Sequence, residues 1–527
     1  MTNHLFAEIR SRMPTPETRF ATLADGRVFR YRDVLEVSAR FANVLAGLGV
    51  KPGDRVAVQV DKSLEALMLY LGTVRAGAIF LPLNNAYTPA EIEYFLGDAK
   101  PAVFVCDPAK AEALRTVAAG AEATLETLGT KNDGTLAEKV AGAETGFADV
   151  ARGPDDLAAI LYTSGTTGRS KGAMLSHENL ASNARVLTRE WRFTKDDVLL
   201  HALPIFHTHG LFVATNIVLF AGAQMIFLSK FDADDILDRM PGATSMMGVP
   251  TFYVRLVDSP RLDREITKGM RLFISGSAPL LAETHRAFQE KTGHAILERY
   301  GMTETNMNTS NPYEGERIAG TVGFPLPGTD LRVVDPDSGK AVADGEIGMI
   351  EVRGPNVFKG YWQNPEKTKA EFRDDGFFIT GDLGKIDARG YVHIVGRGKD
   401  LIITGGYNVY PKEIETEIDG MAGVNESAVI GVAHKDFGEG VTAVVVPVKG
   451  ATLDADAILR TLEGRLAKFK LPKKVFVVDE LPRNTMGKVQ KNVLRETYKA
   501  STRREALPRR EKRPGGGAAE PSSRDFR

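Results

Sequence analysis

The chain has 527 residues, of which 43% are hydrophobic and 26% charged, so it is an ordinary globular sequence long enough for two or more domains. Its 67 basic and 68 acidic residues give a formal net charge of -1, which excludes a global field that recruits nucleic acid or an anionic membrane. The single cysteine, Cys106, excludes an intramolecular disulfide and a multi-cysteine metal site. The N-terminus has no signal-peptide core, and the most apolar long stretch carries Asn216 and Gln224, so we expect a soluble cytoplasmic protein.

From the N-terminus onward, short β-branched runs alternate with helix-length amphipathic stretches. The runs include "RVAVQV", "AVFVCD", "DLAAILYTS" and "QMIFLS", and the longer stretches include "SLEALMLYLGTVRAG" and "HENLASNARVLTREW". This alternation is typical of βαβ units around a mostly parallel sheet. We therefore expect an α/β fold with layered sheets in a large N-terminal domain, residues 1–398.

The sequence pattern changes past about residue 321, where short strands alternate with Asp/Gly-rich turns. This pattern predicts a small β-barrel-like subdomain over about 321–398. After "VGRGKD" a second alternation of strands and helices predicts a smaller α+β domain over 399–500. The last segment, 501–527, mixes Pro, Gly and like charges without apolar spacing, so we expect it to be disordered.

The strongest local signal is "LYTSGTTGRSKG", residues 161–172, where a strand runs into a loop of small residues. Glycines and hydroxyl residues allow backbone N–H groups to surround phosphate oxygens, and a lysine adds a point charge. The candidate residues are Thr163, Ser164, Gly165, Thr166, Thr167, Gly168 and Lys171. The spacing does not fit the P-loop of ordinary nucleotide triphosphatases. A flexible surface loop is the alternative interpretation.

These residues carry a family resemblance, because "YTSGTTGRSKGAMLSHENL" is similar to the signature of the acyl-adenylate-forming superfamily, which includes acyl-CoA synthetases, peptide-synthetase adenylation domains and firefly luciferase. "ERYGMTET", "TGDLG", "GRGKDLIITGGYNVYPKEIE" and "LPRNTMGKVQK" follow in the family order. The resemblance implies two half-reactions. A carboxylate attacks the α-phosphorus of ATP to give acyl-AMP and pyrophosphate, and the thiol of CoA then displaces AMP.

The resemblance also implies an ATP site. In it, the loop from Thr163 to Lys171 holds the β- and γ-phosphates, Glu304 holds Mg²⁺, and Asp382 accepts hydrogen bonds from the ribose beside Arg397. Tyr300 is expected to stack on adenine. The remaining residues of this implied site are Gly276, Ser277, Glu298, Arg299, Gly301, Met302 and Thr303. Taken alone, Asp382 would be interpreted as a turn residue.

Lys488 lies in a polar loop and would in isolation be a solvated lysine. The resemblance implies that it enters the site during adenylation and stabilises charge that develops in the transition state. Acetylation would remove that charge, so a lysine acetyltransferase and a deacetylase are family-level expectations.

Lys399 matches the family hinge, which makes Lys488, Thr163, Glu304 and Lys399 the implied catalytic set. Rotation about the hinge would remove Lys488 from the site and bring in Gly405 and Gly406, with Tyr407, as the CoA-binding residues. A strand-ending turn is the simpler interpretation of this glycine pair.

Arg299 departs from the family pattern, because relatives that take apolar acyl chains commonly carry glycine before the tyrosine. A buried arginine needs a carboxylate, since leaving a buried charge unpaired costs about 3–5 kcal/mol. Glu298 is adjacent but is expected to point to the opposite side of a strand. The alternative partner is a second carboxylate on the substrate, held by a bidentate fork. This favours a short dicarboxylic acid.

Within the family, "SGSAPL", "ERYGMTE" and "PIFHTHGL" most resemble the malonyl-CoA synthetases, which implies malonate and methylmalonate as acids. The acyl-contacting residues would be Arg299, His207, Ser277 and Met302. "HTH" has the spacing of a metal pair but lacks an evident third ligand. Arg286 is a weaker acyl contact.

The rival functions are a ligase for oxalate or succinate, an adenylation enzyme that loads a carrier protein, a non-catalytic nucleotide-binding regulator and a serine hydrolase. The hydrolase is disfavoured because no G-x-S-x-G stretch is present. We expect no nucleic-acid or membrane partner, and a monomer or weak homodimer.

Overall fold

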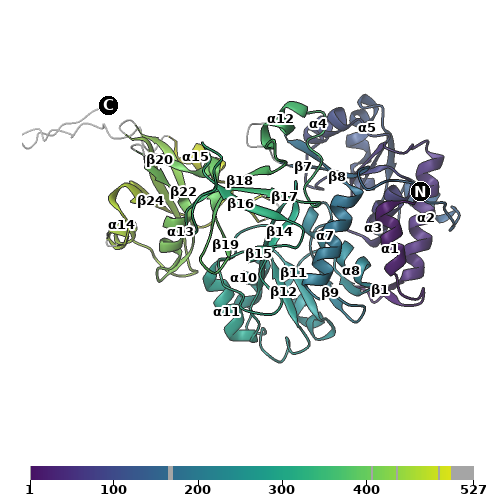
Figure 1. The fold of residues 1–527 in the computed structure, drawn as a ribbon. Coiled ribbons are helices and arrows are strands. Elements are labelled where there is room, and N and C mark those ends of the chain that lie inside the picture. Colours follow the sequence, from purple (N-terminus) through teal and green to yellow (C-terminus); the bar gives the residue numbers. More distant parts are fainter. Residues whose placement is uncertain are drawn as a thin grey trace, which may run out of the picture. The chain divides into compact units, whose positions relative to one another are not determined.

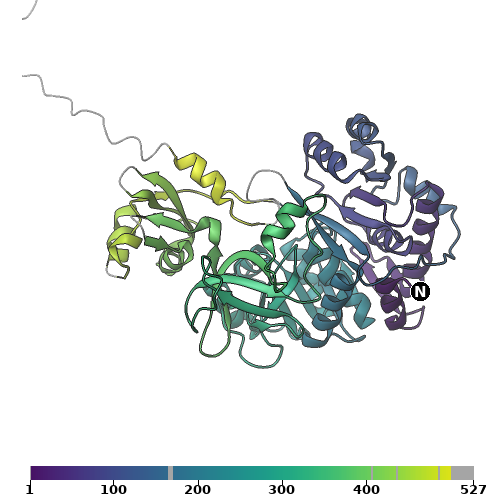
Figure 2. The ribbon, with the colours of Figure 1, turned by 45° about the horizontal axis from the view of Figure 1, so that its top comes forward.

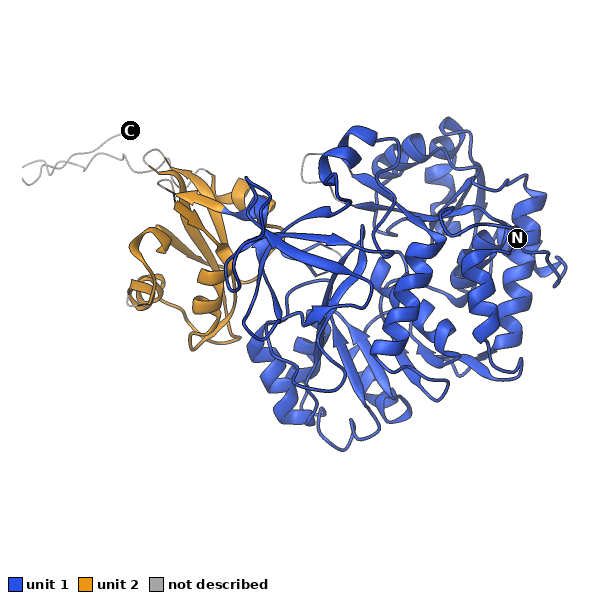
Figure 3. Cartoon of the chain, viewed as in Figure 1, with its two compact units in different colours: residues 1–401, 483–489 blue, residues 402–482, 490–527 orange. Residues whose placement is uncertain are grey.

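The computed structural model of the chain describes residues 2–163, 170–404, 407–434, 437–463, 465–484 and 487–499. It divides into two compact units, one of residues 1–401 with 483–489, the other of residues 402–482 with 490–527 (Figure 3). The division thus falls after Leu401, and a short segment late in the chain returns to the first unit. The expected disordered tail, 501–527, lies outside the described residues.

The first unit contains a six-stranded sheet in the order β6-β5-β3-β4-β7-β8. Its strands are β3 (Arg55–Gln59), β4 (Ile79–Pro82), β5 (Val103–Cys106), β6 (Thr124–Thr127), β7 (Leu157–Thr163) and β8 (Lys171–Ser176). The first five are parallel, and β8 pairs antiparallel with β7. β4 and β5 are buried along their whole length, as expected for parallel strands covered on both faces.

Helices at the N-terminal end cover this sheet and are drawn in purple and blue in Figure 2. They are α1 (His4–Arg12), α2 (Tyr31–Gly47), α3 (Leu64–Arg75), α4 (Pro89–Ala99), α5 (Ala111–Gly120) and α6 (Thr135–Ala141). α2 packs on α3, and α4 packs on α5. α4 begins where the Thr88 hydroxyl caps Glu91 N–H and the Glu91 carboxylate returns to the Thr88 backbone, a reciprocal cap that sets the helix start.

A second sheet of nine strands has the order β15-β14-β13-β12-β11-β9-β10-β1-β2. Its strands are β1 (Arg19–Leu23), β2 (Val28–Arg30), β9 (Val198–His201), β10 (Gln224–Phe227), β11 (Ser245–Gly248), β12 (Leu272–Ser275), β13 (Leu297–Met302), β14 (Asn306–Ser310) and β15 (Phe324–Pro325). The run from β1 through β13 is parallel, and antiparallel strands lie at both edges.

The helices of this part are α7 (His177–Glu190), α8 (Asn216–Ala221), α9 (Ala233–Arg239), α10 (Pro250–Asp258) and α11 (Ala282–Thr292). α7 contacts β8 of the first sheet and β14 of the second, so it joins the two layers (Figure 1). The apolar stretch after residue 208 forms a wide helical turn, η2 (His209–Thr215), then α8, then β10. Among the described residues, no helix is long and apolar enough to cross a membrane.

The expected β-rich subdomain is a four-stranded antiparallel sheet. Its strands are β16 (Asp330–Val334), β17 (Gly348–Arg353), β18 (Phe378–Ile386) and β19 (Val392–Arg397), with α12 (Pro365–Glu371) inserted before β18. The order β16-β17-β18-β19 follows the chain and leaves β16 and β19 at opposite edges, so these strands form an open set of hairpins.

The second unit is a small α+β body with five strands, β20 (Ile402–Thr404), β21 (Tyr407–Val409), β22 (Val424–His434), β23 (Gly438–Pro447) and β24 (Lys474–Val477). Its helices are α13 (Pro411–Asp419), α14 (Ala455–Glu463) and α15 (Lys491–Tyr498). Ile414, Ile418, Val441 and Ile458 pack in its own hydrophobic core. The mixed α/β class, with a large N-terminal and a small C-terminal part, is confirmed.

Cys106 ends β5 and is fully buried in the core of the first unit. Burial raises the pKa of its thiol to about 11, so the unreactive thiol form is present at neutral pH. The role of this residue is therefore strand packing.

Candidate active site

The strand β13 sends neighbouring side chains to opposite faces, and this separates Glu298 from Arg299. Glu298 Oε1 lies 3.2 Å from His285 Nδ1 and accepts a hydrogen bond from the Gly320 amide at 3.1 Å. The internal partner considered from sequence is therefore engaged elsewhere.

Arg299 is 4% exposed, and its Nε and Nη2 atoms have no hydrogen-bond partner among the described residues. Among those residues no carboxylate forms an ion pair with it. Burial lowers the pKa of Arg299 to about 9, which still leaves the guanidinium charged at neutral pH. A buried cation with two free donors is costly for a protein unless a ligand pairs with it.

Two neutral histidines and a serine accompany Arg299. Burial, then the charges of Arg299 and Lys488, lower the pKa of His207 to about 4. His209 is buried as well, and its pKa is lowered well below the usual value for the same main reason. The Ser277 hydroxyl lies 3.3 Å from His209 Nδ1, and the backbone at Ser277 has φ = +72°, a conformation that costs a non-glycine residue about 1–3 kcal/mol.

His209 was missed by sequence reasoning, which assigned the acyl contact to His207. The signal was the second histidine of "HTH", which we had weighed only as a metal ligand. Its Nε2 is buried without a hydrogen-bond partner among the described residues. Arg286, the weaker candidate, is exposed on α11.

Antiparallel pairing of β18 with β19 places Asp382 directly opposite Arg397. Arg397 Nε lies 2.8 Å from Asp382 Oδ1, and the Tyr300 hydroxyl donates to Asp382 Oδ2 at 2.5 Å. The charge of Asp382 is the main reason that the pKa of Arg397 is raised. One carboxylate therefore links the end of β13 to the small antiparallel sheet.

Glu304 is 7% exposed, and burial raises its pKa. The Tyr361 hydroxyl lies 3.1 Å from Glu304 Oε1 and 2.6 Å from Glu371 Oε2. Glu371 in turn lies 3.8 Å from the Lys171 ammonium, which sits 5.0 Å from the Tyr361 ring centroid. Tyr361 and Glu371 were not predicted, because they follow the small-residue loop by about 200 residues and belong to no motif that we used.

Thr163 ends β7 and Lys171 begins β8, and the two are paired across the antiparallel ladder. β7 and β8 therefore pair as neighbouring antiparallel strands. Ser164, Gly165, Thr166, Thr167 and Gly168 lie outside the described residues.

Gly301 and Met302 complete β13, and Thr303 follows in the turn to β14. A Cβ on Gly301 would lie 1.9 Å from the Asn306 carbonyl oxygen, so only glycine fits this irregular pairing. The Met302 sulfur lies 4.0 Å from the Tyr300 hydroxyl. Gly276 follows β12, and a Cβ there would collide with the Arg299 guanidinium.

Lys488 belongs to the 483–489 segment that packs with the first unit. Its backbone N–H donates to Asn484 Oδ1 at 2.9 Å, and Gly487 supplies the left-handed turn with φ = +74°. Lys488 is exposed to solvent, but protein atoms packed around it and the charge of Arg397 lower its pKa, and Asp382 acts in the opposite direction. The charges of Arg397 and Asp382 therefore act on Lys488, and the charge of Lys488 acts on His207.

The residues expected at the hinge and at CoA come from the stretch of chain around the division of the two units. Lys399 is in a short helical turn, η4 (Gly398–Asp400), immediately before the division of the units. Gly405 and Gly406 lie outside the described residues. Tyr407, in the second unit, is 58% exposed, and its ring stacks on Phe469 with centroids 4.6 Å apart.

Two family models match the chain, "AMP-binding enzyme" over residues 10–362 and "AMP-binding enzyme C-terminal domain" over residues 413–488. The ATP-bound crystal structure of MatB from Rhodopseudomonas palustris is similar at 65% identity and a TM-score of 0.94, covering 95% of this chain and 100% of that one. A malonate–CoA ligase of Arabidopsis thaliana is 34% identical over 528 residues, 91% of this chain and 86% of the relative. A feruloyl-CoA synthase of an Amycolatopsis species is 37% identical over 494 residues, 93% and 97% of the two chains.

Proposed function

The chain belongs to the AMP-binding enzyme family and is an AMP-forming acyl-CoA ligase, and from this premise we propose that the acid it activates is malonate. Methylmalonate is expected to be accepted as well. The co-substrates in this proposal are ATP and CoA, and the products are malonyl-CoA, AMP and pyrophosphate. The likeness to a malonate–CoA ligase supports the choice, whereas the comparable likeness to a feruloyl-CoA synthase means that identity alone does not select the acid.

The observation that carries the proposal is the unpaired guanidinium of Arg299. Its free Nε and Nη2 atoms form one edge of the planar group, which is the geometry that binds a carboxylate with two parallel hydrogen bonds. The neighbouring histidines are uncharged, so Arg299 is the cation available to a carboxylate on that side of the acyl site.

Malonate carries two carboxylates, and the charges of Arg299 and Lys488 both act on His207. In our proposal Arg299 binds the carboxylate that does not react, and Lys488 interacts with the carboxylate that does react. Ser277, His207, His209 and Met302 would surround the short chain that joins them. A monocarboxylic acid would leave Arg299 buried and unpaired. It would therefore bind without the ion pair that malonate forms with Arg299.

In the first half-reaction, an oxygen of the free carboxylate attacks the α-phosphorus of ATP. The new O–P bond forms as the bond to the bridging oxygen breaks, and pyrophosphate leaves with the electron pair. Lys488 and Arg397 place positive charge where negative charge accumulates, which lowers the barrier more than it stabilises bound substrate. Asp382 is proposed to accept hydrogen bonds from the ribose hydroxyls, and Tyr300 to lie along the adenine.

Glu304 is the proposed ligand of Mg²⁺. It fits this role because it is a buried carboxylate whose pKa is raised by burial, and Mg²⁺ prefers carboxylate and phosphate oxygens. When bound, the ion would neutralise charge on the phosphates. Thr163, Lys171 and the loop between them are proposed to hold the β- and γ-phosphates, with Glu371 orienting Lys171.

In the second half-reaction, the CoA sulfur attacks the acyl carbon of malonyl-AMP, and AMP leaves with the electron pair of the broken C–O bond. We propose that Lys399 is the hinge for a rearrangement between the two half-reactions, and that Gly405, Gly406 and Tyr407 contact CoA. Acetylation of Lys488 would block the first half-reaction by removing its charge.

The testing experiment measures CoA-dependent AMP formation with Mg-ATP for acetate, malonate, methylmalonate, oxalate, succinate and a medium-chain fatty acid. Wild type is compared with Arg299→Ala and, as the matched control, with Arg286→Ala, which removes an exposed arginine from α11. We expect malonate to be preferred, this preference to be lost only in Arg299→Ala, and Arg286→Ala to behave as wild type.

Preference for a monocarboxylic acid, or unchanged selectivity in Arg299→Ala, would overturn the malonate assignment. The assignment to the acyl-CoA ligases would still hold. Preference for oxalate or succinate would keep the role of Arg299 and correct the chain length. AMP formation that requires a carrier protein in place of CoA would instead support a carrier-loading enzyme.

A further inference from the structure

A second cavity in the first unit is not used by the proposed reaction. It has a volume of about 750 Å³, which lies within the range of small-molecule sites. Loops that follow β3, β4, β9 and β10 line it, so it lies at the carboxyl ends of parallel strands from both large sheets. Open α/β sheets bind ligands in crevices at these ends.

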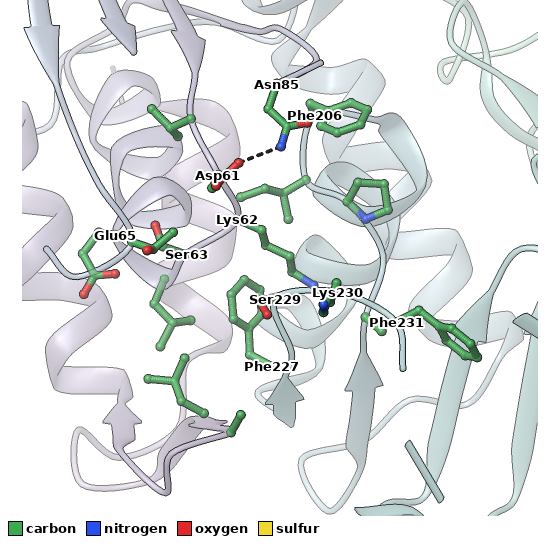
Figure 4. Close-up of a pocket in the computed structure, with 18 of the residues that line it drawn as sticks. Asp61, Lys62, Ser63, Glu65, Asn85, Phe206, Phe227, Ser229, Lys230 and Phe231 are labelled. Atoms are coloured by element: carbon green, nitrogen blue, oxygen red, sulfur yellow. Dashed lines mark hydrogen bonds between the residues drawn. The ribbon is translucent and has the colours of Figure 1, made fainter. Parts of the chain in front are cut away.

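Lys62 is the charged residue at the centre of this pocket, where its side chain points across the cavity toward Lys230 (Figure 4). Its ammonium lies 2.7 Å from the His201 carbonyl oxygen and 3.0 Å from His201 Nδ1. His201 Nε2 lies 2.9 Å from the Gly210 carbonyl oxygen, which fixes Nε2 as the protonated nitrogen and Nδ1 as an acceptor.

An ammonium has three N–H donors, and His201 uses two of those of Lys62. In the part of the chain that the structure describes, no carboxylate pairs with Lys62. Three carboxylates line the pocket: Asp61 accepts from Asn85 at 2.6 Å, Asp25 is paired with Arg27, and Glu65 lies in the first turn of α3. The pocket therefore presents an amine that has no carboxylate partner among the described residues.

Four phenylalanines form part of the wall: Phe206, Phe227, Phe231 and Phe252. The Lys62 ammonium lies 4.3 Å from the Phe227 ring centroid. Phe231 and Phe252 are stacked with centroids 4.0 Å apart, and Phe206 lies across the pocket from Lys62. Arg27 is paired with Asp25, so Lys62 and Lys230 are the basic groups that remain in the lining. Flat apolar surfaces beside these groups suit a ligand with a flat apolar body and a carboxylate.

We propose that the pocket at Lys62 binds a small monocarboxylic acid with a flat apolar body, at a site separate from the acyl site at Arg299. Pro204, Ile205 and Phe206 line this pocket, and His207 is the next residue, so one backbone segment separates the two sites. The binding of the acid does not depend on malonate being the substrate, and the two proposals can fail independently.

Burial supports this assignment, because it lowers the pKa of Lys62 well below its usual value and thereby disfavours the charged form in the free protein. A bound carboxylate would offset that penalty. The site would therefore gain an ion pair with a partner that arrives from solution.

The probe is 4-bromobenzoate, used with the full-length chain in two measurements. In crystals soaked with the probe, anomalous scattering from bromine locates it, and we expect a peak in the pocket of Lys62, Phe227 and Phe231. In calorimetric titrations we expect Lys62→Met to weaken binding at least tenfold, while Lys359→Met, which changes an exposed lysine outside the pocket, and Arg299→Met stay within about twofold of wild type. Tenfold corresponds to about 1.4 kcal/mol.

Melting temperature and ligase activity show whether Lys62→Met is folded, and Lys62→Gln replaces it if that variant fails. A bromine peak confined to the acyl site, or binding lost in Arg299→Met and kept in Lys62→Met, would overturn the proposal. Displacement of the probe by CoA would also overturn it, because the pocket would then belong to the co-substrate. The proposal would also be overturned if the wild-type protein did not bind the probe at millimolar concentration.

Discussion

Gly276 and Arg299 fit together only because residue 276 has no side chain. A Cβ on Gly276 would lie 2.4 Å from the guanidinium carbon of Arg299 and 2.6 Å from its Nε. The colliding atoms belong to the end of a long side chain, so the guanidinium would move while the backbone stayed in place. Gly276 thus sets the position of the cation that we assign to the second carboxylate.

We predict that Gly276→Ala raises the KM for malonate by about 10- to 100-fold, the equivalent of about 1.4–2.8 kcal/mol of lost substrate interaction, with a small change in melting temperature. Steady-state kinetics at saturating ATP and CoA measure this. Gly97→Ala is the matched control, because nothing lies within 4 Å of a Cβ at that position of α4. Unchanged KM in Gly276→Ala would show that the guanidinium position is unimportant for malonate.

Replacing Arg299 by methionine is predicted to stabilise the free protein. The change removes a buried charge that has no partner among the described residues, and comparable replacements of buried charges by apolar side chains are neutral or stabilising by about 1–4 kcal/mol. Thermal unfolding with and without malonate measures it. Malonate should raise the melting temperature of wild type and leave that of Arg299→Met unchanged. A large fall in the melting temperature of Arg299→Met would mean that the guanidinium already has a stabilising partner.

Lys488→Ala is predicted to separate the two half-reactions. Removing a cation that acts on the developing negative charge should slow malonyl-AMP formation by about 10²–10³-fold, as the loss of one stabilising donor does elsewhere. Thioester formation from supplied malonyl-AMP should change by no more than a few-fold. Single-turnover assays of each step measure this, with Lys359→Ala, an exposed lysine paired with Asp155, as the control. Equal losses in both steps would contradict the assignment.

Tyr361→Phe tests whether the phenol positions Glu304. The hydroxyl touches both Glu304 and Glu371, so its loss should free Glu304 to move and raise the Mg²⁺ concentration for half-maximal activity by about 3- to 10-fold, an energy of about 0.6–1.4 kcal/mol typical of one hydrogen bond. The Mg²⁺ titration is run at fixed ATP. If kcat and the Mg²⁺ requirement are both unaltered, the Tyr361 hydroxyl does not position Glu304, and the ring contributes only to packing.

Asp419→Asn is predicted to stabilise the second unit at neutral pH. Burial raises the pKa of Asp419 from 3.8 to about 6, so the native state disfavours the carboxylate. Below pH 3.8 both the native and unfolded forms are protonated and no penalty exists. The penalty grows as pH rises from 3.8 and is complete above about 6, where it reaches at most about 3 kcal/mol.

The measurement for Asp419→Asn is thermal unfolding of both proteins at pH 4.5 and pH 7.5. The gain in melting temperature should be larger at pH 7.5. A gain that is larger at pH 4.5, or a loss at both values, would show that the hydrogen bond from Ser427 and the charge of Lys412 outweigh burial.

Local patterns predicted most elements of this fold. "DLAAILYTS" forms β7 and "PKEIETEID" forms α13, because a buried run or an apolar stripe has the same meaning wherever it occurs. The spacing of apolar residues along the sequence did not predict that residues 483–489 pack with the first unit. That segment is polar, and its neighbour Thr251 lies more than 200 residues earlier.

The residues of the candidate site also fall into two groups, those that the sequence could identify and those that it could not. Asp382, Arg397, Glu304 and Arg299 lie in motifs and could be named from the sequence. Tyr361 and Glu371 could not, because their importance comes from contacts that the fold makes between distant segments. The missing partner of Arg299 was equally invisible, since only a structure shows what a buried side chain fails to touch.

The burial of Cys106 has a practical consequence for spectroscopy. The natural sequence holds one thiol, and that thiol is inaccessible and protonated at neutral pH, so the wild-type background needs no cysteine removal. Val28 in the first unit and Val477 in the second are both exposed on the surface. The pair Val28→Cys and Val477→Cys would accept a donor and an acceptor dye, and the energy transfer between them would test in real time whether the two units change their separation during a catalytic cycle.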